Sequence, residues 1–285
     1  RLRIVTAHFF MKKVNNMEIA ELIQRAYDNE KQDEKPRSYI GASIIGNSCE
    51  AMIGFSLRGF PNTDIDGQLR RIFRDGHRIE NDVVADMKQA KIEVMEKDPM
   101  NNRQWAFHSY GGHAVGHADG IIEAPDGSSW LLEIKSMNDR KFNEFKKNGV
   151  KASHRNYFSQ MQFMMGMAQF EKGVLVVYNK NNSEYHSEII EYDEFYYQSL
   201  RQKVENVLDD RAEQISDDPS DWRCRGCFKR EVCWENKDLK KEHQTRKTCK
   251  NYLPNRDGTW NCENGCQQEC LKWERWRPKP KALST

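Results

Sequence analysis

The side chains most able to do chemistry are two acids and a lysine: Asp119, Glu133 and Lys135. Between the acids, Pro125-Asp-Gly127 has turn chemistry, because proline presets φ and glycine accepts a positive φ. Apolar and β-branched residues flank this turn, so residues 113–135 are predicted to form a β-hairpin. Strand side chains alternate between faces, which places Asp119 opposite Glu133 or within one residue of it. Two carboxylates can hold a divalent cation, and a nearby ammonium can orient a water.

Regular elements are predicted on both sides of this hairpin, and they would position the three side chains. Helical spacing of apolar residues predicts helices over residues 17–29, 66–91, 156–167 and 192–214. Short apolar or alternating runs predict strands over residues 92–96, 105–110, 173–178 and 184–190, and residues 136–141 are expected to form a polar connection. These elements predict a mixed α/β (α+β) fold in which helices flank a central mixed β-sheet. In isolation, Glu133 and Lys135 could also belong to an ordinary solvated strand face.

The length of 285 residues allows one large domain, or a main domain with an appendage. No apolar run approaches the ~18 residues of a membrane span, so no membrane role is expected. Residues 1–10 lack the long apolar stretch of a signal peptide. The chain does not begin with methionine, and Met11 and Met17 are candidate starts, so residues 1–16 are predicted to lie outside the core.

The charge is unevenly distributed along the chain. The net charge is +2, but residues 222–285 hold 16 Lys and Arg against 8 Asp and Glu, which is +8 and leaves −6 for the rest. An acidic body with a basic tail suits a metal site beside a polyanion, although lysines that keep a tail soluble would give the same balance. Basic and aromatic side chains in the tail could neutralise phosphates and stack on bases, and a frayed tail is the alternative. The candidate DNA contacts are Arg223, Arg225, Lys229, Arg230, Trp273, Arg275, Trp276 and Arg277.

The cysteines predict metal ligation. Eight cysteines without a secretory signal indicate metal ligation in a reducing compartment, here the cytoplasm, rather than a disulfide framework. Cys224, Cys227 and Cys233 are spaced as Cys-x2-Cys-x5-Cys, which predicts a zinc or iron–sulfur site that needs a fourth ligand. Cys249 or His243 could complete a zinc site.

A second group of cysteines could close a tetrahedral zinc site of its own. Its members are Cys249, Cys262, Cys266 and Cys270. His243 could replace any one of them, and partly unbound thiols are the alternative.

Three motifs resemble a nuclease superfamily. Gly-His-Ala-Asp119, followed after thirteen residues by Glu133-Ile-Lys135, resembles the signature of PD-(D/E)XK nucleases, with Ala118 in place of the usual proline. Gly-His77-Arg-Ile-Glu80 resembles the helix that precedes the catalytic hairpin in the RecB-like branch, although a lone helix histidine is more often structural.

Gln160 resembles the glutamine motif of RecB-like and phage YqaJ-type exonucleases. The RecB-like pattern expects tyrosine four residues later, where this chain has Met164, and Tyr157 is closer to the YqaJ-type form. Core packing is the ordinary interpretation of Met161, Met164 and Met165.

A distant cysteine extends the resemblance. Cys49 stands where RecB-like nucleases with an iron–sulfur cluster carry the fourth ligand, although a lone cysteine is ordinarily a small buried hydrophobe. The resemblance implies a [4Fe–4S] cluster, with Zn²⁺ as the alternative. Its ligands would be Cys49, Cys224, Cys227 and Cys233.

The resemblance covers about residues 40–235 and implies a restriction-endonuclease-like core. The expected domains are a nuclease domain over residues 17–220 and a cysteine-rich, metal-binding, basic extension over residues 221–285. Mg²⁺ or Mn²⁺ would be held by His77, Asp119, Glu133 and the Ile134 carbonyl. Lys135 would position the attacking water, and Gln160 and Glu80 would orient ligands or water.

The implied activity is metal-dependent exonuclease hydrolysis of DNA in recombination, repair or phage DNA processing, of a phage or CRISPR-associated type. The expected partner is DNA, as ends or single strands. A single-strand annealing or recombination protein is a candidate partner, and an oligomer is compatible with the sequence. The alternatives are a structure-specific endonuclease and a non-catalytic module that grips DNA ends or a partner protein.

Overall fold

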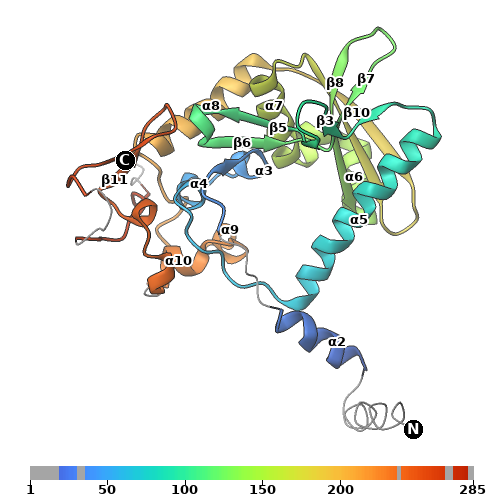
Figure 1. Cartoon of the computed structure of the whole chain (residues 1–285). Coiled ribbons are helices and arrows are strands. Elements are labelled where there is room, and N and C mark those ends of the chain that lie inside the picture. Colours follow the sequence, from blue (N-terminus) through green and yellow to red (C-terminus); the bar gives the residue numbers. More distant parts are fainter. Residues whose placement is uncertain (1–18, 31–35, 236–238, 267–271, 282–285) are drawn as a thin grey trace, which may run out of the picture. The chain divides into compact units, whose positions relative to one another are not determined.

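The computed structural model describes residues 19–30, 36–235, 239–266 and 272–281 (Figure 1). Residues 19–30 and 64–78 form one compact unit, and residues 36–63 form a second, larger unit with the described residues from 79 onward. The predicted segment 1–16 and Cys270 lie outside the described residues. Among the helices of this part of the chain, none is both long and apolar enough to cross a membrane.

The smaller unit contains helix α2 (Ile19–Asp28) and the first part of helix α5 (Gly67–Gln89). Asp28 Oδ1 accepts a hydrogen bond from the Gly67 N–H at 2.6 Å. Gln24 Oε1 accepts one from Arg71 at 2.6 Å. A carboxylate at the start of α5 satisfies a donor that a helix N-terminus leaves free. Both helices match their predicted ranges to within two residues.

A five-stranded mixed sheet forms the centre of the larger unit. Its order is β10–β9–β8–β7–β2, in which β8 and β9 are parallel and the other neighbours are antiparallel. The strands are β2 (Val94–Met95), β7 (Gly120–Glu123), β8 (Ser129–Met137), β9 (Lys172–Asn179) and β10 (Tyr185–Glu191). The inner parts of β8 and β9 are buried, as their long apolar runs require.

Helices cover both faces of this sheet, which confirms the predicted fold class. On one face, Ile79, Val83 and Val84 of α5 belong to the same apolar cluster as Leu132 and Ile134 of β8. On the other face lie α6 (Asp139–Ser153) and α7 (Arg155–Ala168). The period of two along β8 therefore directs neighbouring side chains to different layers.

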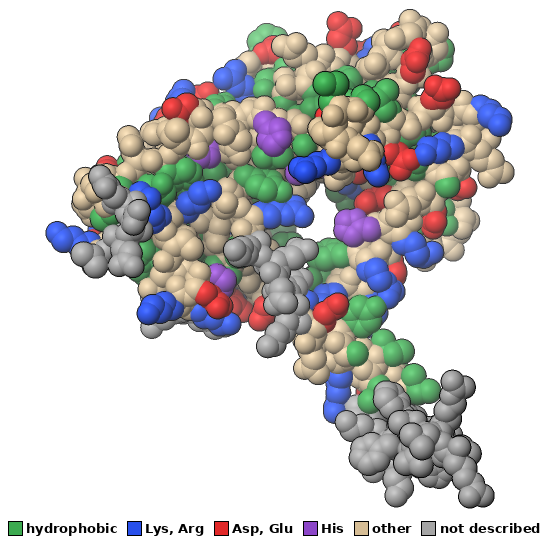
Figure 2. Space-filling model, in the orientation of Figure 1, with side chains coloured by type: hydrophobic (Ala, Val, Ile, Leu, Met, Phe, Trp, Pro, Cys, Tyr) green, Lys and Arg blue, Asp and Glu red, His purple; other side chains and the backbone are tan. Residues whose placement is uncertain are grey.

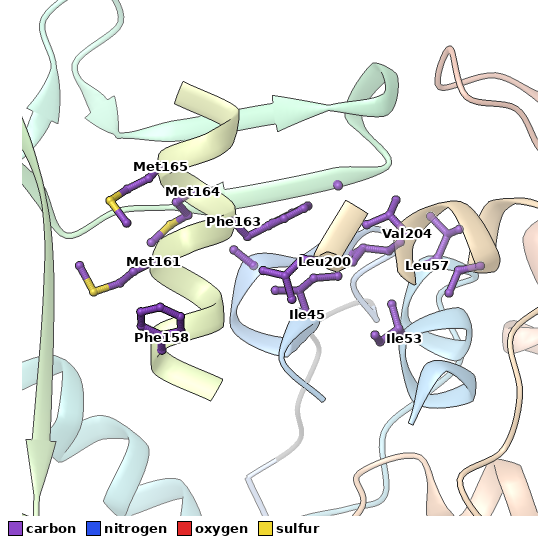
Figure 3. Packing of buried hydrophobic residues seen from close by; sticks show 14 of the residues in the cluster. Ile45, Ile53, Leu57, Phe158, Met161, Phe163, Met164, Met165, Leu200 and Val204 are labelled. Atoms are coloured by element: carbon purple, nitrogen blue, oxygen red, sulfur yellow. The ribbon is translucent and has the colours of Figure 1, made fainter. Parts of the chain in front are cut away.

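The methionines of α7 lie in the larger apolar cluster (Figure 3). Met161, Met164 and Met165 are all fully buried, which confirms that they are core residues. Three other helices meet α7 in this cluster, and they contribute Ile45, Ile53, Leu57, Leu200 and Val204. These helices are α3 (Ala42–Ile45), α4 (Glu50–Leu57) and α8 (Glu194–Leu208).

The first arm of the predicted hairpin is divided between two sheets. β6 (Ala114–His117) pairs with β1 (Ile40–Gly41) and β5 (Ala106–Ser109) in a separate three-stranded sheet, whereas β7 pairs with β8. The division falls at Ala118 and Asp119. Ala118 donates its N–H to the Trp105 carbonyl at 3.1 Å, a bond that a proline at this position could not make.

Two predicted boundaries are wrong. The segment after β8 is not only a polar connection, because α6 begins at Asp139, where the Asn138 side chain caps it by accepting from the Lys141 N–H at 3.0 Å. Phe142 and Phe145, three residues apart, anchor α6 in the core. The last long helix, α8, ends at Leu208 rather than at residue 214.

The remaining elements are short. They are β3 (Lys97–Asp98), β4 (Arg103–Gln104), the 3-10 turns Tyr110–Gly112, Lys241–His243 and Arg246–Thr248, α9 (Trp222–Arg225), α10 (Arg230–Trp234), β11 (Tyr252–Pro254) and β12 (Trp260–Cys262). The described residues from 221 onward belong to the same unit as the sheet, and the predicted limit between residues 220 and 221 stays a prediction.

Trp276 joins this late segment to the core. Its ring lies edge-on to Phe55, with 5.2 Å between centroids, and its Nε1 donates to Asp210 Oδ1 at 2.6 Å. Only 2% of the residue is exposed, and the Arg58 guanidinium lies 4.8 Å from its ring centroid. Phe55, Phe60 and Trp276 thus form an aromatic cluster that is completed by a residue near the end of the described chain.

We expect Trp276→Ala to lower the free energy of unfolding by about 3–5 kcal/mol, because it leaves a cavity in a close-packed cluster. Trp222→Ala is the matched control, since Trp222 is 76% exposed and its loss should change the value by less than about 0.5 kcal/mol. Urea denaturation measures both. Equal effects of the two substitutions would contradict the role of Trp276 in the core.

Candidate active site

Asp119 and Glu133 lie opposite each other at the start of the β7–β8 hairpin. Gly120 pairs with Leu132, and the antiparallel register places the preceding residue, Asp119, across from Glu133. Asp119 Oδ2 accepts the N–H of Ile134 at 2.7 Å. The predicted position of the two acids in the hairpin is confirmed.

The Glu133 carboxylate is buried in the layer between β8 and α7. Only 1% of its side chain is exposed. Its Oε1 accepts from Gln160 Nε2 at 2.6 Å and from Lys135 Nζ. Its Oε2 is buried and has no hydrogen-bond partner among the described residues. Gln160 therefore lies where the glutamine motif predicted, directly against one of the two acids.

Lys135 is held from two sides. Its ammonium donates to Glu133 and lies 5.4 Å from the centre of the Tyr157 ring. The ring of Tyr157 is stacked on His154, with 5.6 Å between centroids and 4° between planes. A cation over an aromatic face is attracted to the ring quadrupole, so Tyr157 helps to fix the position of Lys135.

The charges of Asp119, Glu133 and Lys135 shift one another's pKa values. Burial, followed by the charge of Glu133, raises the pKa of Asp119 to about 8. Burial also raises the pKa of Glu133, against the opposing effect of Lys135. Burial alone would lower the pKa of Lys135, but the charges of Glu133 and Asp119 raise it overall. Two carboxyl groups thus compete for one ammonium, and a further positive charge would stabilise both as anions.

Two other predicted residues lie on α5. The charge of Glu80 contributes to the raised pKa values of Asp119 and Glu133, after burial and the charges on the hairpin, so Glu80 lies near the pair. His77 is exposed and belongs to the smaller unit. Metal contacts by His77 and by the Ile134 carbonyl stay predictions.

The acid pair fits an oxygen-liganded cation. Among the described residues, no group of three or more His, Cys, Asp or Glu side chains is arranged to hold a metal ion. Asp119 and Glu133 nevertheless provide two carboxylates, and Glu133 Oε2 is a buried acceptor without a donor. A divalent cation such as Mg²⁺ or Mn²⁺ is the partner that suits such an oxygen.

The four cysteines of the first predicted cluster influence one another. The pKa values of Cys224 and Cys227 are raised, first by burial and then, among other groups, by Cys49. Burial and the three other thiols raise the pKa of Cys233 to about 11, although Gln214, which donates to its Sγ at 3.1 Å, opposes this. The charge of Cys49 thus reaches three thiols that follow it by more than 170 residues, and an iron–sulfur cluster held by the four cysteines stays a prediction.

The second cysteine group is only partly described. Cys262 and Cys266 were predicted to belong to the same zinc site. They lie close enough for Cys266 to lower the pKa of Cys262. Cys249 is buried and forms an isolated antiparallel β-bridge with Arg275. Cys270 lies outside the described residues, so a zinc site here stays a prediction.

Two of the predicted DNA contacts are wrong because their side chains are buried. Trp276 belongs to the core, and Lys229 is 4% exposed and donates its ammonium to the Phe60 carbonyl at 2.5 Å. Burial lowers the pKa of Lys229 to about 8. Arg275 is half-buried and donates to the Val232 carbonyl.

The other candidates reach the surface. Arg223, Arg225 and Arg277 are exposed, and Arg230 and Trp273 are partly exposed. Figure 2 shows Lys and Arg side chains interspersed with Asp and Glu on the visible face. DNA contacts by these five residues stay predictions.

Known proteins resemble this chain only distantly. No family model and no curated protein sequence matches it. The alkaline exonuclease LHK-Exo from Laribacter hongkongensis is similar at 18% identity and a TM-score of 0.46, over 67% of this chain and 92% of that one. Its complex with dAMP is similar at 15% identity and a TM-score of 0.45, over the same shares. A phage-related exonuclease from Haemophilus somnus is similar at 12% identity and a TM-score of 0.43, over 59% of this chain and 91% of that one. At these identities, no activity follows from the likeness.

We expect the metal-free protein to lose stability as the pH rises from about 4 towards 8. The pKa of Asp119 is higher in the folded than in the unfolded chain, so the folded state binds more protons in this range. Each such proton contributes up to about 1.4 kcal/mol per pH unit. Asp119→Asn should flatten this dependence of the free energy of unfolding, measured by urea denaturation with a chelator present.

Glu123→Gln is the control for this experiment, since Glu123 is an exposed acid on the same hairpin. It should leave the pH dependence of the free energy of unfolding unchanged. An equal slope in Asp119→Asn and the wild type would show that Asp119 carries no raised pKa.

Proposed function

We propose that this protein is a metal-dependent nuclease that hydrolyses DNA phosphodiester bonds, with the exonuclease mode suggested by its sequence motifs. The observation that carries the proposal is the buried, unpartnered Oε2 of Glu133 opposite Asp119 and beside Lys135. Burying a carboxylate oxygen without a donor costs free energy, so a site that keeps one is expected to use it for a ligand.

Each side chain has a distinct role in this proposal. A bound Mg²⁺ or Mn²⁺ would polarise a phosphoryl oxygen and lower the pKa of a water. Asp119 and Glu133 would hold the cation, with the Ile134 carbonyl as a further ligand. Gln160 fixes the orientation of Glu133 through its 2.6 Å hydrogen bond. Lys135 would orient the water and offset the charge that develops at phosphorus.

The test is degradation of labelled linear and circular DNA with Mg²⁺ or Mn²⁺. Glu133→Gln should lower the rate by roughly 10³-fold, because it removes an anionic ligand and several kcal/mol of transition-state stabilisation. Glu123→Gln keeps the hairpin and should retain full activity.

The outcome also separates the alternative functions. Cutting of circles as well as linear molecules would indicate an endonuclease. Binding of DNA without cutting by the wild type would indicate a gripping module and would refute the catalytic roles proposed for Asp119, Glu133 and Lys135.

We also propose that Cys49, Cys224, Cys227 and Cys233 hold a [4Fe–4S] cluster. The raised pKa values of Cys224, Cys227 and Cys233 support this, because buried and crowded thiols resist ionisation until a cation binds them as thiolates. Such a cluster would link α4 to α9 and α10. The cytoplasmic setting predicted from the cysteines is part of this proposal.

Protein purified without oxygen should contain about four iron atoms and as much acid-labile sulfide per chain, measured chemically. Cys233→Ser should remove most of both. Cys262→Ser, outside this group, should leave them unchanged. Zinc in place of iron in the wild type would refute the iron–sulfur cluster and favour the zinc alternative.

A further inference from the structure

A pocket of about 420 Å³ opens between the first turns of α6 and the junction of α6 with α7. At this junction His154 follows the last residue of α6 and precedes the first residue of α7. The residues used below are Arg140, Lys141, Glu144, His154, Arg155 and Tyr157.

The pocket is positively charged. Arg140, Lys141 and Arg155 carry three positive charges, and Glu144 carries one negative charge. Burial lowers the pKa of His154, an effect that Glu144 opposes and Lys141 increases. The formal charge of the other four side chains sums to about +2.

Tyr157 connects this pocket to the acid pair. Lys135 Nζ lies 5.4 Å from the centre of the Tyr157 ring, and His154 is stacked on this ring with 5.6 Å between centroids. Tyr157 also lines the pocket. Because Tyr157 contacts Lys135 and also lines the pocket, a strand with one phosphate at Glu133 and Lys135 would have a neighbouring phosphate near the pocket.

The chemistry of the pocket suits a phosphate. Two arginines offer planar, forked donors that match the oxygens of a phosphate as well as those of a carboxylate. They are exposed, which suits an extended ligand that passes over the surface. The start of α7 adds the partial positive charge of a helix N-terminus.

We propose that the pocket binds one internal backbone phosphate of the strand being cut, next to the phosphate at the acid pair. This inference rests on the proposed nuclease function, and it names the subsite that sets the path of the strand. The subsite is built from α6 and α7 rather than from the basic C-terminal residues.

The test uses single-stranded oligonucleotides without terminal phosphates, in which one linkage at a time is a neutral methylphosphonate. Binding to the Glu133→Gln protein is measured by fluorescence anisotropy with Mn²⁺, and cleavage is measured with protein that retains Glu133. We expect the neutral group to weaken binding by about tenfold at one linkage. The double substitution Arg140→Gln, Arg155→Gln should weaken binding of the unmodified strand by a similar factor and remove the effect of that linkage.

Lys147→Gln is the matched control, because Lys147 is exposed on α6 but does not line the pocket. It should leave the effect of the sensitive linkage unchanged. Arg140, Lys147 and Arg155 are all exposed, and circular dichroism would check that each variant is folded.

An equal loss of binding affinity at every linkage, or no loss of affinity at any linkage, would overturn the phosphate subsite. So would an effect of the linkage that persists in the double variant, or binding of an acidic peptide in place of the oligonucleotide. These results are distinct from failure of the nuclease proposal, which would appear as an absence of cleavage by the protein that retains Glu133. The binding experiment tests the subsite in either case.

Discussion

A carboxylate buried in the middle of a sheet constrains the structure around it. Glu133 lies on a central strand, and removing its charge from water would cost several kcal/mol without compensation. The compensation comes from Lys135 on the same strand and from Gln160 on α7. Because α7 also carries the buried methionines, its position is fixed by the core and by the acid together. The site and the core are therefore parts of one packing arrangement.

Much of the site could be predicted from the sequence, because its geometry is local. The Pro-Asp-Gly turn and the period of two were enough to place Asp119 opposite Glu133 or within one residue of it. Gln160 was predicted from the resemblance to the glutamine motif of RecB-like and YqaJ-type exonucleases.

The features that could not be predicted depend on distant partners. Residues 114–117 and 120–123 have similar apolar character, and only their partners assign them to different sheets. α6 was missed because the polar Asn138 was interpreted as part of a connection rather than as a helix cap. Lys229 and Trp276 have residue types that suit DNA, but packing against the α4 region buries them. Residue type alone does not report burial.

The place of Trp276 has a consequence for how the chain folds as it is made. Synthesis proceeds from the N-terminus, and domains usually fold as units once their contacts exist. Phe55 and Phe60 are made early, but the indole that packs against them follows more than 200 residues later. Contacts so distant in sequence are slow to form. The aromatic cluster must therefore remain open during most of translation, and the nascent chain would expose apolar rings to chaperones throughout that period.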